Sequence, residues 1–589
     1  MVGYIICDIE TDSLQPSLIH VICCLDTNTN TYHTFTSDPS MGEELLMFTT
    51  FVENNKDTNK FVFHGGINFD LPVINKFIKK DLLTVDMIED TLILSRMLDV
   101  YPIDGLGHSL GAWGQRLNCP KIEFHEYELL TQEMIDYCKG DISTGAKTFE
   151  HLKKELIRKK ISRKSIDLEY CIQELITQQE NNGFKLDIPK AMQFVASLED
   201  KADILNDRLI ETFKPVPIFD KDIKVKYIKA TGELSKVGLN HYRNSLVDVV
   251  GDHSRIKFQE FNPSSRQQIA ERLIKLGWKP TKFTEKGNVI VDEGALANID
   301  IPEANILKEK MLLEKRITQA ASWIDAVDNN DRVHGRVFTL GAVSTRMTHN
   351  SPNMAQVPAS YSPYGPECRQ LWIPEEPNVL LGCDASGLEL RVLAHYLNDP
   401  VFTKEVLDGD IHTANQKAAG LSTRDEAKTF IYAFLYGAGP AKIGSIVGGS
   451  AKDGQRLIDL FLKNVPALAA LKHKLSIEIK TKKGWIRGLD GRLLKVRSEH
   501  SALNLLCQGA GAIICKAWLV GIFRLNYDKL PFKLVASIHD EYQFEVHPDH
   551  AKELGSITRR AIKDIEQQYN VLCPLDSEFK IGANWSLTH

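Results

Sequence analysis

Several common features are missing from this sequence, and each absence excludes a class of protein. No apolar run approaches the roughly 18 residues that a membrane span needs, so we expect no membrane partner. The eleven cysteines are scattered without a repeated CxxC spacing, which predicts reduced core residues in a reducing cytoplasm, and neither disulfides nor zinc. The first residues, MVGYIICDIE, reach an acid too early for a secretory signal. What remains has the composition of an ordinary soluble globular chain.

An excess of positive charge is also missing. The chain has 71 Lys and Arg residues against 77 Asp and Glu residues, a net charge of −6, which by itself argues against a polyanionic partner. Basic residues are nevertheless concentrated in residues 153–164 and 480–497. Such runs are either solvated helix faces or parts of a nucleic-acid channel. At 589 residues, the chain is long enough for several domains of about 100 to 200 residues each.

Two distant segments each predict a carboxylate at the end of a buried strand. In VLLGCDASGLELR, residues 379–391, an apolar run leads to Asp384 before the chain turns into a helix. In LVASIHDEYQFEV, residues 534–546, an apolar strand and an alternating strand form a hairpin whose turn carries Asp540. A lone aspartate at such a place is more often a turn residue. As a pair, these aspartates would suit two Mg²⁺ ions about 4 Å apart, the arrangement used for phosphoryl transfer.

The segment between these acids predicts a helix with a cationic and aromatic stripe. Thr423 and Glu426 form a capping-box pattern at its start, and Gly437, Gly439 and Pro440 end it. Cations near a helix N-terminus suit a triphosphate, and tyrosines further along suit a base and a sugar. The alternative is an ordinary amphipathic helix with a basic face. The stripe consists of residues four apart: Arg424, Lys428, Tyr432 and Tyr436.

A second set of acidic residues lies near the N-terminus. Asp8 and Glu10 stand two apart in the predicted strand YIICDIETD, hence on one face. Asp70 follows a strand and a glycine turn, and Tyr137 and Asp141 stand four apart on one helical face. The first pair alone is equally compatible with acids that merely end a strand. The ordered set of four carboxylates and a tyrosine is therefore the informative observation.

These motifs resemble those of a known family. DASGLELR, RDEAKTFIYAFLYG and HDE, in that order, resemble motifs A, B and C of family A DNA polymerases. GDIHTANQ, IRGLDGR and ALNLLCQGAGAIICK resemble segments of the replicative polymerases of T-seven-type bacteriophages, and the N-terminal acids resemble those of DEDDy proofreading exonucleases. The resemblance covers nearly the whole chain. It implies a multidomain α/β and α+β fold in which an RNase H-like 3′–5′ exonuclease domain precedes a right-hand polymerase with thumb, palm and fingers.

The resemblance also implies domain boundaries. Residues 1–155 form the exonuclease, 156–335 the thumb, 336–400 the first part of the palm, 401–480 the fingers, and 481–589 the second part of the palm. A variable insertion occupies about 214–260, where enzymes of this type carry a thioredoxin-binding segment, and it predicts a hairpin around Thr231-Gly232. This segment does not align with that insertion, so thioredoxin binding is not carried over. A small embellishment and a different processivity device are the alternatives.

For the polymerase site, the resemblance implies a role for each matching residue. Asp384 and Asp540 bind two Mg²⁺ ions, with the Ala385 carbonyl as a further ligand, and Lys428 is the general acid for the leaving pyrophosphate. Residues implied to bind the nucleotide are His412, Arg424, Lys428, Tyr432, Tyr436 and Glu389, of which Glu389 and Tyr436 form a steric gate against a ribose 2′-hydroxyl. Residues implied to contact DNA are Arg346, Gln508, Asn504 and His539.

For the N-terminal site, the resemblance implies two further Mg²⁺ ions on Asp8, Glu10, Asp70 and Asp141, with Tyr137 orienting the attacking water. The implied function is template-directed extension of a DNA primer with proofreading; the alternative is a DNA-binding 3′–5′ exonuclease without polymerising activity. Implied partners are primer–template DNA and dNTPs, with a thioredoxin-like processivity factor and a replicative helicase–primase as further candidates. We expect a monomeric catalytic chain that, if phage-encoded, acts in the host bacterial cytoplasm.

Overall fold

A computed structural model of the chain describes residues 2–102, 104–119, 123–224, 228, 230–233, 235–236, 252–297, 299–526 and 529–589. The fold divides into two compact units. Unit 1 combines Met1–Asp187 with Ala326–His589, and unit 2 is Ile188–Asp325. The predicted domain boundaries stay predictions. The middle part of the predicted thumb, however, forms a unit of its own, whereas the helix that precedes it packs in unit 1.

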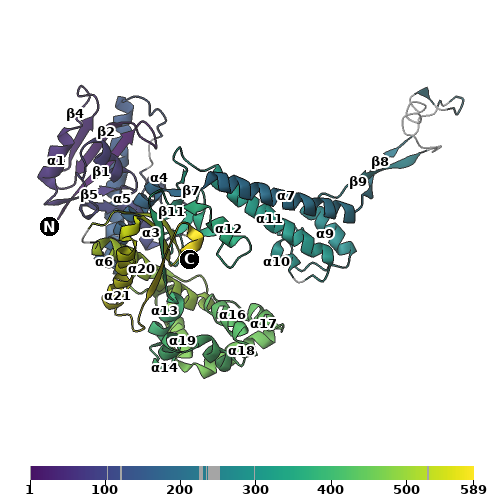
Figure 1. Ribbon diagram of the computed structural model, residues 1–589. Coiled ribbons are helices and arrows are strands. Elements are labelled where there is room, and N and C mark those ends of the chain that lie inside the picture. Colours follow the sequence, from purple (N-terminus) through teal and green to yellow (C-terminus); the bar gives the residue numbers. More distant parts are fainter. Residues whose placement is uncertain are drawn as a thin grey trace. The chain divides into compact units, whose positions relative to one another are not determined.

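The N-terminal part of unit 1 is a six-stranded mixed sheet flanked by helices (Figure 1). Its central strand β1 (Gly3–Thr11) pairs antiparallel with β2 (Ile19–Asp26) and parallel with β5 (Asn59–Phe63). The parallel pairing requires a crossover connection, and helix α1 provides it by carrying the chain from the β4 edge to the other side of β1. The helix α5 packs on β1 and β2. The other strands are β3 (Thr31–Thr36), β4 (Glu43–Glu44) and β6 (Ile88–Asp90), and the helices are α1 (Met47–Asn55), α2 (Asp70–Phe77), α3 (Thr91–Leu98), α4 (Leu110–Arg116) and α5 (Gln132–Lys159).

Helix α6 (Arg163–Asn182) contacts both the N-terminal sheet and the C-terminal part of unit 1. Its Tyr170 hydroxyl donates to Glu89 Oε2 at 3.0 Å and accepts from the Asp90 N–H at 3.0 Å. The neighbouring Glu169 is fully buried and accepts from Lys516 Nζ at 2.7 Å. Buried charges need such partners, so α6 is fastened on two sides by polar contacts as well as by packing.

The C-terminal part of unit 1 is organised around a four-stranded antiparallel sheet in the order β17-β18-β14-β19. The predicted strand and hairpin are confirmed: β14 spans Val379–Ala385, and β17 (Phe532–Ile538) turns directly into β18 (Glu541–Val546). Helix α21 (Pro548–Gln568) packs on β14, β19 (Ser577–Gly582) and α20. Shorter elements are β7 (Phe184–Leu186), β10 (Arg332–Val333), β11 (Arg336–Phe338), β12 (Thr348–Asn350), α12 (Gly365–Arg369), β13 (Trp372–Ile373) and α13 (Leu388–Leu397).

Helix α20 contradicts the expectation that no apolar run approaches the length of a membrane span. The helical stretch Glu499–Leu525, which contains α20 (Ala502–Leu525), is long and apolar enough to cross a membrane, so the view that no apolar run approaches that length was wrong. Its most apolar 18-residue window is 89% buried inside the fold. Small residues such as Gly509 and Ala510 let neighbouring elements approach it closely. The helix is therefore read as a core helix.

Between α13 and α20 the chain is mostly helical (Figure 1). Residues 400–481 form six helices, and a short antiparallel pair follows, β15 (Trp485–Arg487) with β16 (Leu493–Lys495). Apolar side chains such as Phe430, Phe434 and Phe461 pack in the core between these helices. The helices are α14 (Pro400–Leu407), α15 (Ile411–Ala419), α16 (Arg424–Leu435), α17 (Pro440–Ile446), α18 (Ala451–Asn464) and α19 (Pro466–Thr481).

Unit 2 contains two long helices, α7 (Ile188–Thr212) and α11 (Pro302–Ile324), which pack against each other. Among the described residues of unit 2, the shorter helices are α9 (Arg266–Lys275) and α10 (Glu293–Leu296). Within the predicted insertion, β8 (Val216–Ile223) pairs with β9 (His253–Gln259). At the centre of the predicted hairpin, the Gly232 N–H donates to the Ile228 carbonyl at 2.8 Å, and Gly232 has a positive φ of 72°. The hairpin itself stays a prediction. Residues 225–227, 229, 234 and 237–251 of the predicted insertion lie outside the described residues.

Candidate active sites

The two aspartates predicted from distant segments meet at one edge of the C-terminal sheet. Asp384 lies in β14 opposite Glu541, the first residue of β18. Asp540 occupies the tight turn just before it, and the Ala385 N–H donates to the Asp540 carbonyl at 3.1 Å. His539, the other turn residue, takes a positive φ of 57°, which histidine tolerates better than a branched residue does. The sheet register therefore brings both carboxylates to the same place.

These aspartates resist ionisation in the absence of a cation. Burial raises the pKa of Asp384 to about 7, and the neighbouring Asp540 and Glu541 add to the shift. Burial likewise raises the pKa of Asp540. Two partly buried carboxylates that repel each other become favourable when a divalent cation lies between them, and oxygen ligands suit Mg²⁺. The residues present fit a site for divalent metal ions, and the number of ions stays a prediction.

Helix α16 has the predicted boundaries and the predicted stripe. Its N-cap Thr423 and Glu426 form a complete capping box, and the helix ends just before Tyr436. Arg424 Nε donates to Asp410 Oδ2 at 2.6 Å. The pKa of His412 is lowered by burial and further by the positive charges of Arg424 and Lys428. The three cationic or basic side chains predicted for the triphosphate are thus brought together.

Glu389 joins the helical stripe to the sheet edge. Both of its carboxylate oxygens accept from the Tyr436 hydroxyl at 2.8 Å, and Oε1 also accepts from Arg346 Nη2 at 3.0 Å. The Tyr432 and Tyr436 rings stack at 6.4 Å. Arg346, Glu389, His539 and Asp540 line one small cavity of about 30 Å³. The two residues predicted to form a steric gate are therefore in contact, and Arg346, predicted to contact DNA, forms an ion pair with Glu389.

Two further residues predicted to contact DNA lie on α20. Asn504 and Gln508 are one helical turn apart and partly exposed, whereas almost every neighbour on this helix is buried. One turn further along, Gly511 and Ala512 line the same cavity as Asp540. The only polar stripe in this part of the helix therefore leads toward the candidate catalytic aspartates.

The sequence analysis did not predict the contacts that surround Glu541. Glu541 is buried, and its carboxylate accepts from the Trp585 indole, from Gln543 Nε2 at 2.7 Å and from Arg369 Nη1 at 3.4 Å. His589 Nδ1 lies 2.8 Å from Oε2. These contacts lower the pKa of Glu541 although burial acts to raise it, so this carboxylate stays ionised and bonded. No local sequence pattern links residues that are 44 to 172 positions apart.

The N-terminal acids gather around the end of β1. Oxygens of Asp8 and Glu10 lie within 4.8 Å of each other and of the Cys138 sulfur. The Ile9 N–H, between the two acids, donates to Asp70 and acts to lower its pKa. Burial has the larger effect and raises the pKa of Asp70 to about 7. Burial also holds the pKa of Cys138 well above its usual value, so its thiol is protonated and the acids are the better metal ligands.

Helix α5 supplies the other two predicted residues. Asp141 is buried and lines a very small cavity of about 10 Å³ together with Asp8. Tyr137 lies one turn earlier on the same helix, and its pKa is raised by burial and by Asp141, so the hydroxyl remains a hydrogen-bond donor. The predicted helical face is confirmed. The metal-binding roles of the four acids stay predictions.

Asp90 has a structural role that the sequence analysis did not assign. It caps α3, and its carboxylate accepts four backbone N–H groups, from Leu92 at 2.9 Å, Gly65 at 3.1 Å, and Ile67 and Ile93 at 3.2 Å each. Gly65 and Ile67 belong to the turn that leads to Asp70. The sequence pair Asp-Thr before an apolar helix is an N-cap signal. The hydrogen bonds of Asp90 with the Gly65 and Ile67 N–H groups could not be predicted in this way, because they depend on how the sheet folds.

Comparisons with known proteins agree with this geometry. The family DNA polymerase family A matches residues 237–587, and the RNase_H superfamily matches residues 5–103. The DNA-directed DNA polymerase of Enterobacteria phage T3 is 32% identical over 708 aligned residues, covering 99% of this chain and 100% of the relative. That of Escherichia phage T7 is also 32% identical, over 709 residues with the same coverage.

A solved structure is similar over the whole chain. It is the POL domain of Pol1 from M. smegmatis in complex with DNA primer-template and dNTP, with a TM-score of 0.78, and the match covers 100% of this chain and 96% of that chain. At 15% identity this likeness shows the fold alone, an RNase H-like domain followed by a right-hand polymerase. Because the family match covers more than half of the chain and the phage relatives cover nearly all of it, the chain belongs to DNA polymerase family A.

Proposed function

We propose that this protein extends a DNA primer on a template with dNTPs and removes mispaired primer ends with its 3′–5′ exonuclease. The observation that carries the proposal is the meeting of Asp384 and Asp540 at one sheet edge, with raised pKa values, next to the Glu389–Tyr436 contact of α16. An anion-binding helix beside a buried carboxylate pair is what nucleotidyl transfer requires.

In the polymerase site, Asp384 and Asp540 hold two Mg²⁺ ions, with the Ala385 carbonyl as a further ligand. When bound, these ions stabilise charge on the attacking and leaving oxygens. Arg424 and His412 bind the triphosphate, and Lys428 donates a proton to the leaving pyrophosphate. The Asp410 carboxylate now paired with Arg424 is exposed, so a triphosphate can replace it as the partner of that guanidinium.

Selection of the nucleotide follows from the Glu389–Tyr436 pair. Each group fixes the other, so they present a rigid wall where a ribose 2′-hydroxyl would project. Tyr432 lies beside the sugar. Arg346, Asn504, Gln508 and His539 contact the minor groove and the primer end, where the acceptors common to all correct base pairs report geometry without reading sequence.

In the exonuclease site, Asp8, Glu10, Asp70 and Asp141 hold two further Mg²⁺ ions. The Tyr137 hydroxyl orients the water that attacks the terminal phosphodiester. Hydrolysis at this site releases one nucleotide and returns a primer end that the polymerase site can extend. The two sites thus perform opposite reactions on the same strand.

The basic residues 480–497 contact the primer–template through its phosphates, which position the duplex without reading sequence. Partners beyond DNA and dNTPs, namely a processivity factor and a helicase–primase, are part of the proposal only as expectations from the resemblance. If the protein is phage-encoded, as the phage T3 and T7 relatives suggest, we place it in the cytoplasm of the bacterial host.

Incubation of the purified protein with a 5′-labelled primer on a longer template, with Mg²⁺, tests the function directly. With all four dNTPs the primer is expected to lengthen to the template end, and without dNTPs it is expected to shorten. Shortening under both conditions would establish the alternative, an exonuclease that does not polymerise. Omission of Mg²⁺ should stop both reactions.

A further inference from the structure

Asp410 is an acid that lies among the side chains proposed to bind the triphosphate. Its carboxylate caps α15, because Oδ1 accepts from the His412 and Thr413 N–H groups at 3.1 and 3.4 Å. Oδ2 accepts from the Thr413 hydroxyl at 2.8 Å and from Arg424 Nε at 2.6 Å. The carboxylate thus serves the helix that it begins and also binds the first residue of α16.

The contact with Arg424 places a negative charge beside the N-terminus of α16. A helix N-terminus favours anions, and the proposed function assigns this place to the triphosphate. The hydrogen bond with Arg424 lowers the pKa of Asp410, and Asp410 in turn raises the pKa of Arg424. Asp410 is therefore ionised at physiological pH, and it neutralises a cation that a phosphate group would otherwise find free.

The same carboxylate acts on His412. The positive charges of Arg424 and Lys428 lower the pKa of His412, whereas the negative charge of Asp410 acts to raise it. All three proposed triphosphate ligands therefore lie within electrostatic reach of one another and of this acid. In the protein without nucleotide, Asp410 supplies part of the negative charge that the triphosphate would supply.

The pair of Asp410 and Arg424 is accessible and can be exchanged. The two side chains are 42% and 52% exposed, so a polyphosphate can approach them from solvent. Exposed ion pairs are weak, and phosphate oxygens form stronger, charge-assisted hydrogen bonds with a guanidinium group. A triphosphate can thus displace the carboxylate, but its apparent affinity is reduced by the fraction of molecules in which the pair is closed.

We propose, building on the proposed function, that Asp410 is a positioning residue that competes with the triphosphate for Arg424. The competition weakens the binding of dNTPs, and it favours release of the pyrophosphate product, because the carboxylate returns to Arg424 when the phosphates leave. Asp410 touches neither the reacting atoms nor the metal ions in this role. It acts only by holding Arg424 between one nucleotide and the next.

The substitution Asp410→Asn separates this role from the helix cap. Asparagine caps helices about as well as aspartate, so α15 keeps its N-cap while the charge is lost. Asp399→Asn is the matched control, because Asp399 caps α14 in the same way, accepting from the Val401 and Phe402 N–H groups at 2.9 and 3.3 Å. Within the described residues, Asp399 forms no ion pair.

Primer extension at a single template position measures the effect on catalysis. Asp410→Asn should lower the KM for the dNTP by about three-fold, the effect of one exposed ion pair, without raising kcat. The inhibition constant of pyrophosphate should fall by the same factor. A cap that had merely been damaged would raise the KM, so a lower KM is the result that a structural role cannot give. Asp399→Asn should leave both constants unchanged.

A binding measurement tests the competition without catalysis. Calorimetric titration with inorganic tripolyphosphate, in EDTA so that no metal ion contributes, should give a dissociation constant about three-fold lower for Asp410→Asn than for wild type. Binding that is equal or weaker in Asp410→Asn would overturn the proposal, and so would an unchanged KM. The same tightening in Asp399→Asn would also overturn it, because it would show an effect of net charge alone.

The two measurements distinguish this proposal from the proposed function. If the wild-type protein failed to extend a primer while Asp410→Asn still bound tripolyphosphate more tightly, the proposed function would be contradicted and the competition at Arg424 would stand. If the wild-type protein extended the primer and Asp410→Asn showed neither change, the competition would be contradicted and the proposed function would stand.

Discussion

At the scale of single residues, Tyr432 offers a clear test of how the nucleotide is held. Burial, Glu389 and Asp540 raise the pKa of its hydroxyl, which therefore remains a donor near the proposed sugar position. A dideoxynucleotide lacks its 3′-hydroxyl, and the tyrosine hydroxyl can supply the missing contact. Tyr432→Phe should lower dideoxynucleotide incorporation relative to the normal dNTP by about ten-fold, the value of one hydrogen bond.

The measurement is the ratio of chain termination to extension at a single template position. Tyr361→Phe is the matched control, because Tyr361 is 91% exposed and lies outside the candidate sites. The same ratio in wild type and Tyr432→Phe would reject this account of Tyr432.

The lowered pKa of His349 should make the free energy of unfolding depend on pH. Burial and the nearby His539 lower the pKa of His349 to about 4, whereas an unfolded histidine titrates near 6.5. Between these values the unfolded chain binds more protons, so the free energy of unfolding falls as the pH drops from about 6.5 toward 4. His349→Gln should flatten this part of the profile by at most about 3 kcal/mol.

Urea unfolding of wild type and His349→Gln at pH 7.0, 5.5 and 4.5 measures the difference. His473→Gln changes an exposed histidine and should leave the slope unchanged. Parallel profiles for wild type and His349→Gln would show that His349 is protonated as readily in the folded protein as in the unfolded chain.

At the scale of elements, the N-caps of two helices allow the two activities to be separated. Thr423 caps α16, which carries the proposed triphosphate ligands, and Thr131 caps α5, which carries Tyr137 and Asp141. Replacing a threonine cap by alanine costs about 1 kcal/mol of helix stability. Thr423→Ala should raise the KM for dNTPs about three- to five-fold and leave excision of single strands unchanged, and Thr131→Ala should show the reverse pattern.

Steady-state extension and single-strand excision, measured for both variants, make each the control for the other. An equal reduction of both activities by both substitutions would contradict the prediction. It would show that the substitutions act through overall stability and that α16 has no separate role in nucleotide binding.

Replacement of the buried Glu169 on helix α6 should greatly lower the free energy of unfolding. Glu169 is completely buried and accepts from both Lys516 and Arg492, which are themselves 1% and 2% exposed. Glu169→Gln leaves two buried cations short of one negative charge, which typically costs about 3 to 5 kcal/mol. Glu155→Gln, which breaks a surface pair with Arg158 on α5, should cost less than about 1 kcal/mol. Thermal unfolding midpoints compare the two, and similar midpoints would contradict the role of α6 as a buried link.

Local chemistry explains what could be predicted at this scale. The capping box and the glycines bounded α16 correctly, and alternation with a polar turn located β17 and β18. The contacts of Glu541 with Trp585 and Arg369 could not be predicted, because they depend on how the sheet folds and leave no periodic trace. The apolar length of helix α20 was underestimated, because a few polar residues interrupt an otherwise apolar stretch.

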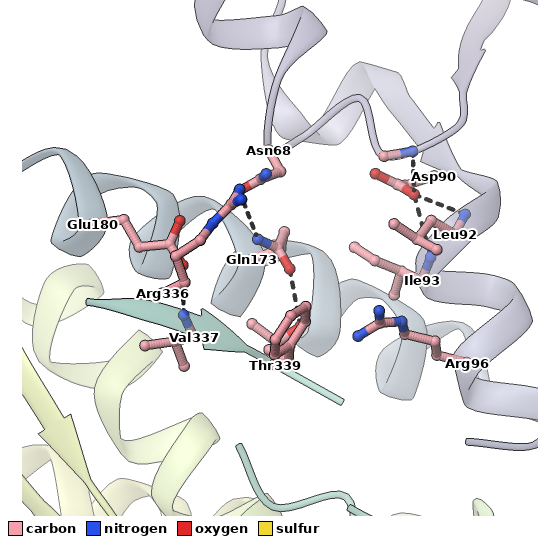
Figure 2. A pocket seen from close by; sticks show the side chains of 12 residues that line it. Asn68, Asp90, Leu92, Ile93, Arg96, Gln173, Glu180, Arg336, Val337 and Thr339 are labelled. Carbon is pink, nitrogen blue, oxygen red and sulfur yellow. Dashed lines mark hydrogen bonds between the residues drawn. The ribbon is translucent and has the colours of Figure 1, made fainter. Parts of the chain in front are cut away.

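At the scale of the whole molecule, the resemblance predicted the order of domains, and the family matches confirm an RNase H-like domain and a family A polymerase. The candidate sites were predicted residue by residue because each motif is short and local. The cavity lined by Gly65, Arg96 and Phe338 (Figure 2) was not predicted, since its lining residues come from positions 65 to 339 and only the fold brings them together. Sequence motifs therefore identify the reacting groups better than the surfaces between them.

The central claim is that Asp384 and Asp540 act together in strand growth, separately from the N-terminal acids. The most direct measurement is primer extension and single-strand excision by Asp384→Asn, Asp540→Asn and Asp8→Asn, each shown to be folded by its thermal unfolding. The account predicts that the first two abolish extension and retain excision, and that Asp8→Asn does the opposite. Undiminished extension by Asp384→Asn or Asp540→Asn would contradict it.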